Sequence, residues 1–280
     1  MNNNNLSIRK TPVDSDILPY TYSLNFLLDM CILKKKYDNF IILVLYNKNS
    51  ECASSFSEIK KRRLLFFNEV SLDTILDETF MVTTIQSLCR KHKRFVIINL
   101  TINPEKKLQH ANLIIIDTKK KEVYRFAPQG SREKHTKLDE LLEKFFVKVN
   151  PKYKFIKIKE YLPYFFLQSQ EVFLQKLGKK HKLDTIGSCY YWCHYFLKLR
   201  LKFPDMDIKK LAEKCIKGIE DSKKTDMRRI IRNHAQNMEK LIKKEYPQLE
   251  EKFGPYREEL FYNEEYHREC CKIYIKEFKY

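Results

Sequence analysis

The chain has 280 residues, of which 43% are hydrophobic, and its 54 Lys and Arg against 36 Asp and Glu give a formal net charge of +18. This length and composition suit one large domain, or a core with appendages. They supply enough apolar residues to build a substantial hydrophobic core. The longest uninterrupted apolar run, residues 40–46, is far too short to span a bilayer, so no membrane span is expected.

The cysteines predict the compartment. Eight are present without any paired spacing, apart from Cys270 and Cys271, which are adjacent. Residues 1–5 do not resemble a signal peptide. A disulfide framework is therefore not expected, and we predict a reducing, intracellular setting.

The N-terminal third of the chain mixes helix and strand patterns. Residues 22–34 form a helical pattern, residues 40–46 read as a buried strand, and residues 71–92 look helical.

Three strands are predicted next. Residues 94–102, 110–117 and 123–126 are short runs rich in branched or aromatic side chains, with a polar turn at residues 118–122 before the last. Residues 138–149 then repeat apolar side chains at intervals of three and four, which predicts an amphipathic helix.

The most informative segment begins at Gly187-Ser188, which delivers Cys189 to the first turn of a helix that is apolar on nearly every side. Unpaired main-chain N–H groups and the positive end of the helix dipole favour a thiolate there, and the thiolate is the reactive form of cysteine. A small buried core residue is the alternative for Cys189, because free cysteine is among the most buried residue types.

Two helices follow this segment. Asp207 is expected to cap a helix that ends at Gly218, and residues 225–245 form a longer one with His234 on its apolar face as a core histidine. Strands flanked by helices, with the Cys189 helix buried as the central element, predict an α+β fold.

A histidine upstream strengthens the nucleophile interpretation of Cys189. His110 stands at the start of the predicted strand 110–117. A histidine there is more often a core or edge residue, but together with a cysteine at a helix start it is a candidate for a thiolate–imidazolium couple.

At this point the sequence resembles the cysteine proteases that process ubiquitin-like proteins, the SUMO-protease and adenovirus-protease group, and especially the version encoded by large DNA viruses. The resemblance covers about residues 94–205. Its motifs, in chain order, are His110-Ala111-Asn112 with Asp117, Arg125-Phe126-Ala127-Pro128-Gln129-Gly130, Gln168-Ser169-Gln170-Glu171, and Asp184-Thr185-Ile186-Gly187-Ser188-Cys189-Tyr190-Tyr191-Trp192, followed by Tyr195, Leu199-Arg200-Leu201 and Pro204.

The resemblance implies a papain-like fold with the nucleophile helix packed on a mixed β-sheet. It implies that Cys189 is the nucleophile, that His110 is the general base, and that the Gln168 amide and the Cys189 N–H form the oxyanion hole. One position departs from the family, because Ala127 stands where an acidic residue or Asn orients the histidine. Gln129 could substitute if the strand continued past Pro128, since positions 127 and 129 would then share a face.

Metal binding is a rival chemistry for Cys189, Cys193, His194 and His181. A structural zinc site normally draws on a second ligand pair at short spacing, and the sequence has neither Cys-x-x-Cys nor His-x-x-x-His. No metal and no cofactor are therefore expected, and Cys193 and Trp192 are predicted to pack in the core.

The positive charge lies in residues 1–204, since residues 205–280 are nearly balanced. It comes in short runs at residues 34–36, 60–63, 90–94, 119–121 and 179–182. Nucleic acid or an acidic surface is one possible partner, and lysine-rich solvated turns are the alternative.

We expect an N-terminal α/β region at residues 1–93 that packs on the core, a catalytic core at 94–205 that holds the motifs, and a C-terminal helical extension at 206–280. The predicted function is a cysteine peptidase that cleaves after small residues, of the Gly-Gly or Gly-x-Gly type, in a ubiquitin-like modifier or a viral precursor protein. The compartment would be the host cytoplasm or the virion for a viral protein, and otherwise the cytoplasm or nucleus. The alternative, kept open by Ala127, is a catalytically degenerate relative that binds a ubiquitin-like protein, a viral structural protein or nucleic acid.

Overall fold

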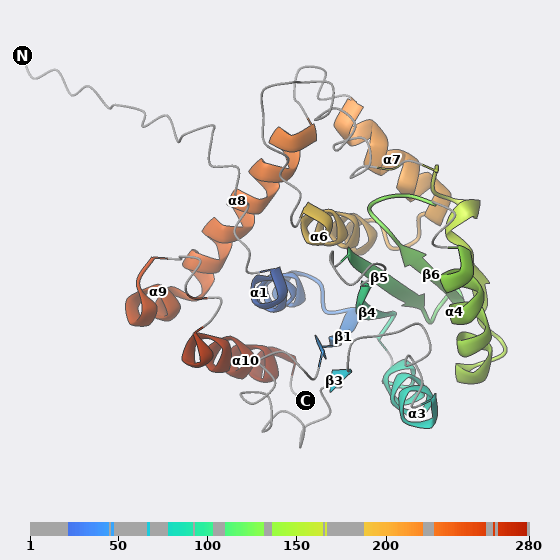
Figure 1. Ribbon diagram of the computed structural model, residues 1–280, viewed down its shortest axis with the longest axis horizontal. Coiled ribbons are helices and arrows are strands. Elements are labelled where there is room, and N and C mark those ends of the chain that lie inside the picture. Colours follow the sequence, from blue (N-terminus) through green and yellow to red (C-terminus); the bar gives the residue numbers. More distant parts are fainter. Residues whose placement is uncertain are drawn as a thin grey trace, which may run out of the picture.

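The computed structural model describes residues 22–44, 46–47, 66–67, 78–91, 93–102, 110–131, 136–164, 166, 188–220, 227–255, 260 and 263–278. Its centre is a five-stranded sheet in the order β1-β4-β5-β6-β7 (Figure 1). The strands are β1 (Phe40–Val44), β4 (Phe95–Ile102), β5 (His110–Asp117), β6 (Glu122–Phe126) and β7 (Lys154–Ile156). Parallel pairs at both edges enclose the antiparallel pairs β4–β5 and β5–β6, so the sheet is mixed. A separate parallel pair joins β2 (Tyr46–Asn47) to β3 (Phe66–Phe67).

Helices cover both faces of this sheet, so its central strands are apolar on both sides. In β5, Ala111, Leu113 and Ile115 belong to one hydrophobic cluster, while Ile114 and Ile116 belong to a second. Successive side chains of a strand point to opposite faces, which explains why this run of branched residues reads as continuous.

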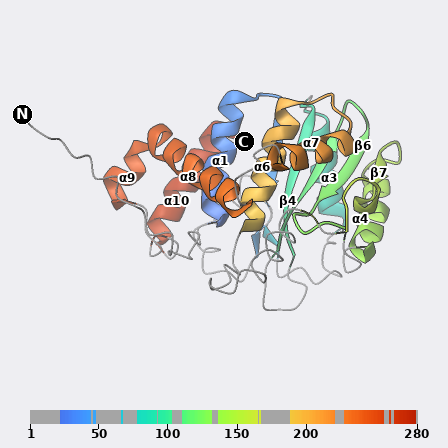
Figure 2. The same ribbon diagram turned by 90° about the horizontal axis from the view of Figure 1, so that it is seen from above.

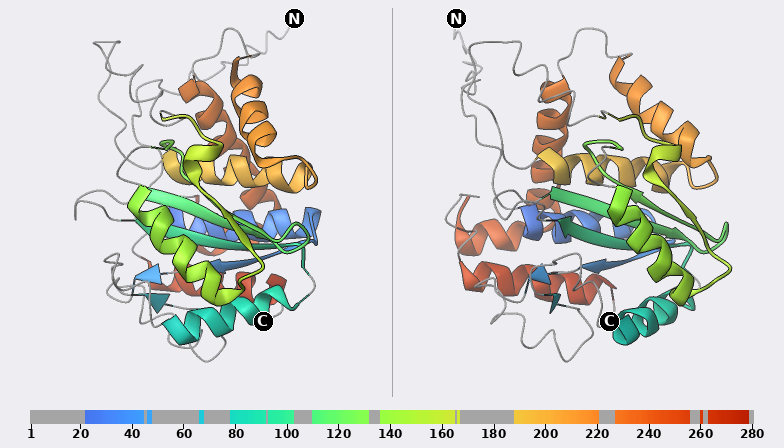
Figure 3. Two further views of the ribbon diagram at one scale, coloured as in Figure 1. Left: turned by 90° about the vertical axis from the view of Figure 1, so that its right-hand side faces the viewer. Right: turned by 45° about the vertical axis from the view of Figure 1, so that its right-hand side comes forward.

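The first cluster packs under α1 (Tyr22–Lys36) and α6 (Ser188–Lys202), and the second under α3 (Glu78–Cys89) and α4 (Thr136–Val149). Figure 2 shows α6 and α4 on opposite sides of the sheet, and Figure 3 shows α6 and α3 in the same relation. In α4 the apolar side chains Leu138, Leu142, Phe145 and Phe146 are buried in one stripe, and that stripe faces the sheet.

The C-terminal helices extend the first cluster away from the sheet. They are α7 (Ile208–Glu220), α8 (Met227–Glu245), α9 (Pro247–Phe253) and α10 (Glu264–Phe278). Helix α6 contacts β5, α1, α7 and α8, while α10 packs along α1. Helix α6, which carries Cys189, is thus the central helix of this half of the molecule, as predicted.

The predicted elements agree with the structure in type, and the α+β class is confirmed by the mixed sheet and its covering helices. The helix expected at residues 71–92 spans Glu78–Cys89, and residues 71–77 lie outside the described residues. The strand expected at 40–46 ends as β1 at Val44, and Tyr46 belongs to β2.

One predicted boundary was wrong. Main-chain N–H groups of Lys209 and Lys210 donate to the Asp207 carboxylate at 2.8 and 3.2 Å, so the predicted cap is confirmed. The helix does not end at Gly218, however, but continues to Glu220. A single interior glycine costs a helix only about 1 kcal/mol relative to alanine, and the buried face of Ile208, Leu211 and Cys215 outweighs that cost.

One hydrophobic cluster joins the three expected regions, because it includes Leu27, Trp192 and Tyr274. The three regions therefore share one core among the described residues, and the boundaries at residues 93 and 205 stay predictions. None of the described helices is long and apolar enough to span a membrane.

Candidate active site

Cys189 is the second residue of α6, as predicted, and its side chain is only 3% exposed. At this position it lies among the first four main-chain N–H groups of the helix, which have no partner within the helix. The positive end of the helix dipole adds to their effect, and both favour a negative charge on the Cys189 sulfur.

The start of β5 supplies another donor. The main-chain N–H of Ala111 donates to Cys189 Sγ at 3.5 Å, and Cys193 Sγ, one turn along α6, donates to the Ala111 carbonyl at the same distance. The two sulfurs of α6 therefore bracket one residue of β5. Pairing of β5 with β6 stops at Leu113 and Phe126, so this contact lies beyond the end of that ladder.

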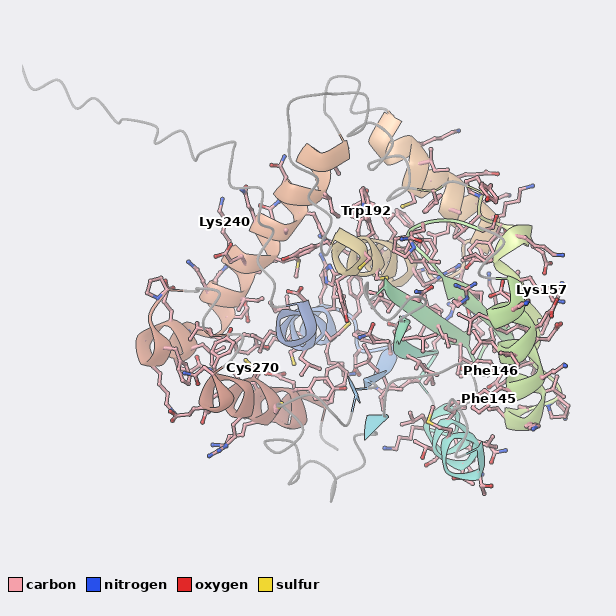
Figure 4. The ribbon with its side chains drawn as sticks, in the orientation of Figure 1. Phe145, Phe146, Lys157, Trp192, Lys240 and Cys270 are labelled. Carbon is pink, nitrogen blue, oxygen red and sulfur yellow. The ribbon has the colours of Figure 1, made fainter. Side chains whose placement is uncertain are left out.

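Cys193 is a packed core residue. Burial raises the pKa of the Cys193 thiol well above its ordinary value, and neighbouring Cys189 raises it further. Cys193 is fully buried, so its predicted core packing is confirmed. Trp192, labelled on α6 in Figure 4, is also fully buried, so its predicted core role is confirmed.

The other two predicted catalytic residues are described only in part or not at all. His110 is the first residue of β5, and its main chain directly precedes the Ala111 N–H that contacts the Cys189 sulfur. Its side chain and all of Gln168 lie outside the described residues. The His110–Cys189 couple and the oxyanion role of Gln168 therefore stay predictions.

The segment after β6 turns away from the sheet. β6 ends at Phe126, and the Gly130 N–H donates to the Ala127 carbonyl at 3.0 Å, which closes a turn over residues 127–130. Strand alternation therefore does not place Gln129 on the face of Ala127. An orienting role for Gln129 stays a prediction. Ala127 itself is 1% exposed within the first hydrophobic cluster.

This turn is bonded to the segment that leads toward Gln168. The Ser131 N–H donates to the Pro163 carbonyl at 2.9 Å, and the Phe166 N–H donates to the Gln129 carbonyl at 3.2 Å. Gly130 has a φ of 93°, and a Cβ atom at this position would lie 2.6 Å from the carbonyl oxygens of Pro163 and Tyr164. Only glycine allows the two main chains to approach this closely.

A buried polar network that the sequence did not predict adjoins this turn. We call it the Arg125 network, and its members are Arg125, Asn112, Asp139 and Tyr161. The Arg125 guanidinium contacts Asp139 Oδ1 at 2.7 and 2.8 Å and Asn112 Oδ1 at 2.9 Å. A signal was present, because a charged residue inside a fully buried strand requires a partner.

A second buried polar pair joins α6 to α8. His194 Nδ1 and His234 Nε2 are 2.9 Å apart, and both side chains are buried. His234 is thus the core histidine that the sequence predicted. For the metal alternative, His181 lies outside the described residues, and the described residues contain no group of three or more Cys, His, Asp or Glu side chains placed to bind a metal.

Acidic side chains neutralise part of the basic runs. Lys35 pairs with Glu245 at 3.0 Å, and Arg94 and Lys119 share Asp205 at 2.8 and 3.3 Å. The runs at residues 60–63 and 179–182 lie outside the described residues. Ion pairing favours the solvated-turn interpretation for the described runs, and contact with nucleic acid through them stays a prediction.

No family model matches the chain, and no curated protein matches it. Among solved structures, the Chlamydia trachomatis effector protein Cdu1 bound to ubiquitin matches with a TM-score of 0.41 and 15% identity over 81% of this chain and 96% of that one. ChlaDub1 from the same organism matches with a TM-score of 0.43 and 13% identity over 84% and 95%. These scores are too low to establish a shared fold, and the identities are too low to transfer an activity.

Proposed function

We propose that this protein is a cysteine peptidase of the SUMO-protease and adenovirus-protease type, with Cys189 as its nucleophile. In this proposal the Cys189 thiolate attacks the carbonyl carbon of the scissile bond, and His110 takes the thiol proton and returns it to the leaving amine. The Gln168 amide and the Cys189 N–H stabilise the oxyanion, at roughly 2.7–4 kcal/mol per donor. Water then hydrolyses the thioester and regenerates the thiol.

One observation carries the proposal. The sulfur of Cys189, at the start of a buried helix, accepts the N–H of the residue that follows His110 at a distance of 3.5 Å. A nucleophilic cysteine and its base must lie within hydrogen-bond reach of one another. The two main-chain segments that carry them are adjacent, although Ala111 and Cys189 are 78 positions apart in the sequence.

The proposal makes two demands on the structure. Odd-numbered positions of β5 belong to the α6 face, so the strand must leave its regular alternation at His110, its terminal residue, for the couple to form. The Cys189 sulfur must also become accessible, because a peptide cannot reach a residue that is 3% exposed.

The substrate class follows from the resemblance of the motifs. We propose cleavage after a small residue, of the Gly-Gly or Gly-x-Gly type, in a ubiquitin-like modifier or in a viral precursor protein. We further propose a reducing compartment, such as a host cytoplasm, since a catalytic thiol must stay reduced to react.

The test uses electrophilic probes built on the C-termini of ubiquitin and of SUMO, together with Gly-Gly-x peptides. The folded wild type should form an adduct with one member of the panel, on Cys189 by peptide mass mapping, and the denatured protein should form none. Cys189→Ala should abolish the adduct. Cys193→Ala is the matched control one turn away on the same helix, and it should retain it. An adduct in the denatured protein, or one on a different cysteine, would contradict the proposal.

One observation favours a second candidate. The Ala127 side chain offers no hydrogen-bond acceptor at the position where the family orients its histidine, and it is buried among apolar side chains. A relative that has lost catalysis would keep the fold as a binding module for the same modifiers. Tight binding of unmodified ubiquitin or SUMO, with no adduct from any probe, would favour this candidate.

A further inference from the structure

The Arg125 network is built around a charged pair that has no access to water. Arg125 in β6 is 0% exposed and Asp139 in α4 is 2% exposed. Two guanidinium nitrogens of Arg125 reach Asp139 Oδ1, at 2.7 and 2.8 Å, in the close geometry of a charge-assisted pair.

The other polar groups of Arg125 and Asp139 form hydrogen bonds to neighbouring segments of the chain. Arg125 donates to Asn112 Oδ1 at 2.9 Å, and Asn112 lies two residues after His110 in β5. The second oxygen of Asp139 accepts the N–H of Ile158 at 2.8 Å, and the Arg125 carbonyl accepts the hydroxyl of Tyr161. The network therefore ties the start of β5 to the segment that begins at Tyr161.

That segment continues to the turn beside the candidate site. Residues 163 and 166 bond to the main chain at residues 131 and 129, and Gln168 follows two residues beyond Phe166. One buried pair thus links the strand that begins at His110 to the segment that is described as far as Phe166.

Stability alone does not account for the pair. Burial raises the pKa of Asp139 above its ordinary value, and the contact with Arg125 opposes that rise. Both charges lose their water when they are buried, and this loss offsets the attraction between them. Apolar side chains of similar volume often replace such buried pairs without loss of stability. The hydrogen bonds of the pair to β5 and to Ile158 point instead to a role in geometry.

We infer that the Arg125–Asp139 pair is a positioning element of the proposed peptidase, which fixes the spacing between the His110 end of β5 and the segment leading to Gln168. This inference rests on the proposed function. Arg125 and Asp139 are positioning residues, because neither is argued to touch the substrate. With no side-chain acceptor at Ala127, the placement of the base depends on the main chain of β5, and this network holds that main chain in place.

The test compares two double variants of the full chain. Arg125→Met with Asp139→Leu removes both charges and keeps the side-chain volume. The matched control, Arg94→Met with Asp117→Asn, breaks an ion pair of 3.3 Å at the opposite end of β5. For the probe that labels the wild type, the first variant should lower the inactivation rate constant kinact about 10²-fold, with the binding constant KI unchanged, because a misplacement of about 1 Å can cost that much. The control should stay within about threefold of the wild type.

A second measurement does not depend on activity. Hydrogen exchange followed by mass spectrometry should show faster exchange at residues 110–113 and 161–166 in the first variant only. If the first double variant does not fold, Asn112→Ala removes the hydrogen bond from Arg125 to β5, leaves the Arg125–Asp139 pair intact, and should show the same two effects more weakly.

The outcomes separate the inference from the proposed function. If no probe labels the wild type, the proposed function is wrong. The positioning role is then supported only if hydrogen exchange becomes faster at residues 110–113 and 161–166 in the first variant. Unchanged exchange in the first variant overturns the positioning role. So does a folded first variant, or a folded Asn112→Ala variant, that reacts as fast as the wild type.

Discussion

The buried pair of His194 and His234 predicts that this protein loses stability on mild acidification. The rings are joined at 2.9 Å between α6 and α8, and each must be neutral to be buried at low cost. Burial, and secondarily the charge of Lys198, lowers the pKa of His234 from 6.5 to about 4. Burial and then His234 and Lys198 lower the pKa of His194 well below its ordinary value.

The sign and size of the effect follow from proton linkage. Between pH 6.5 and about 4 the unfolded chain binds a proton at His234 that the folded chain does not, so unfolding becomes easier as the pH falls through this window. Above the window both states are neutral, and below it both are protonated. A shift from 6.5 to about 4 corresponds to roughly 3 kcal/mol for His234 alone. That is a large part of a typical stability of about 5–15 kcal/mol.

The assay is urea unfolding followed by circular dichroism at several pH values between 7.5 and 4, on the wild type and on His234→Gln. Glutamine keeps a polar group near His194 but cannot take up a proton. The stability advantage of the wild type over the variant should shrink by roughly 3 kcal/mol across the window. Lys202→Met removes an exposed lysine from α6, the helix of His194, and should give a profile parallel to that of the wild type. Parallel profiles for the wild type and His234→Gln would refute the reasoning.

Three further predictions concern the candidate site. Gly130→Ala should lower the free energy of unfolding by at least about 2 kcal/mol in a urea titration, because a positive φ disfavours a side chain and two carbonyl oxygens lie 2.6 Å from the added Cβ. An unchanged unfolding midpoint would contradict this crowding. Gln168→Ala should slow peptide turnover by about 10²–10³ with little change in thermal stability, and an unchanged rate would assign the oxyanion hole to other donors. Ala127→Asp should raise or preserve the labelling rate of Cys189 if an acceptor is what the site lacks, and a folded variant that reacts more slowly would count against that view.

The strands were predictable because their side chains leave little choice. The run from Leu113 to Ile116 is too short and too branched for a surface helix, and both faces of β5 are buried. The position of Cys189 was predictable for a local reason, since Gly187-Ser188 before an apolar run is a helix start. In each case neighbouring residues contained the information.

The Arg125 network could not be predicted in the same way. Asn112, Arg125 and Asp139 lie on β5, β6 and α4, and their contacts depend on the register of the sheet and on how α4 lies across it. The sequence shows only that a buried arginine needs a partner. The condition under which positions 127 and 129 would share a face is not met for a related reason, because the main-chain hydrogen bonds of Gly130 and Phe166 replace the strand with a turn.

The contact between α10 and β1 has a consequence for how the chain acquires its structure. The Tyr274 hydroxyl donates to the Ile42 carbonyl at 3.1 Å across 232 positions, and the Phe278 ring packs on Phe40 with the centroids 6.0 Å apart. At about 5–20 residues per second, a ribosome completes Tyr274 only tens of seconds after Ile42. During that interval β1 lacks the helix that later covers it, and its apolar residues are available to chaperones or to wrong partners. Long-range closure of this kind also slows folding, so we expect the edge of the sheet at β1 to be the last part of the core to become protected.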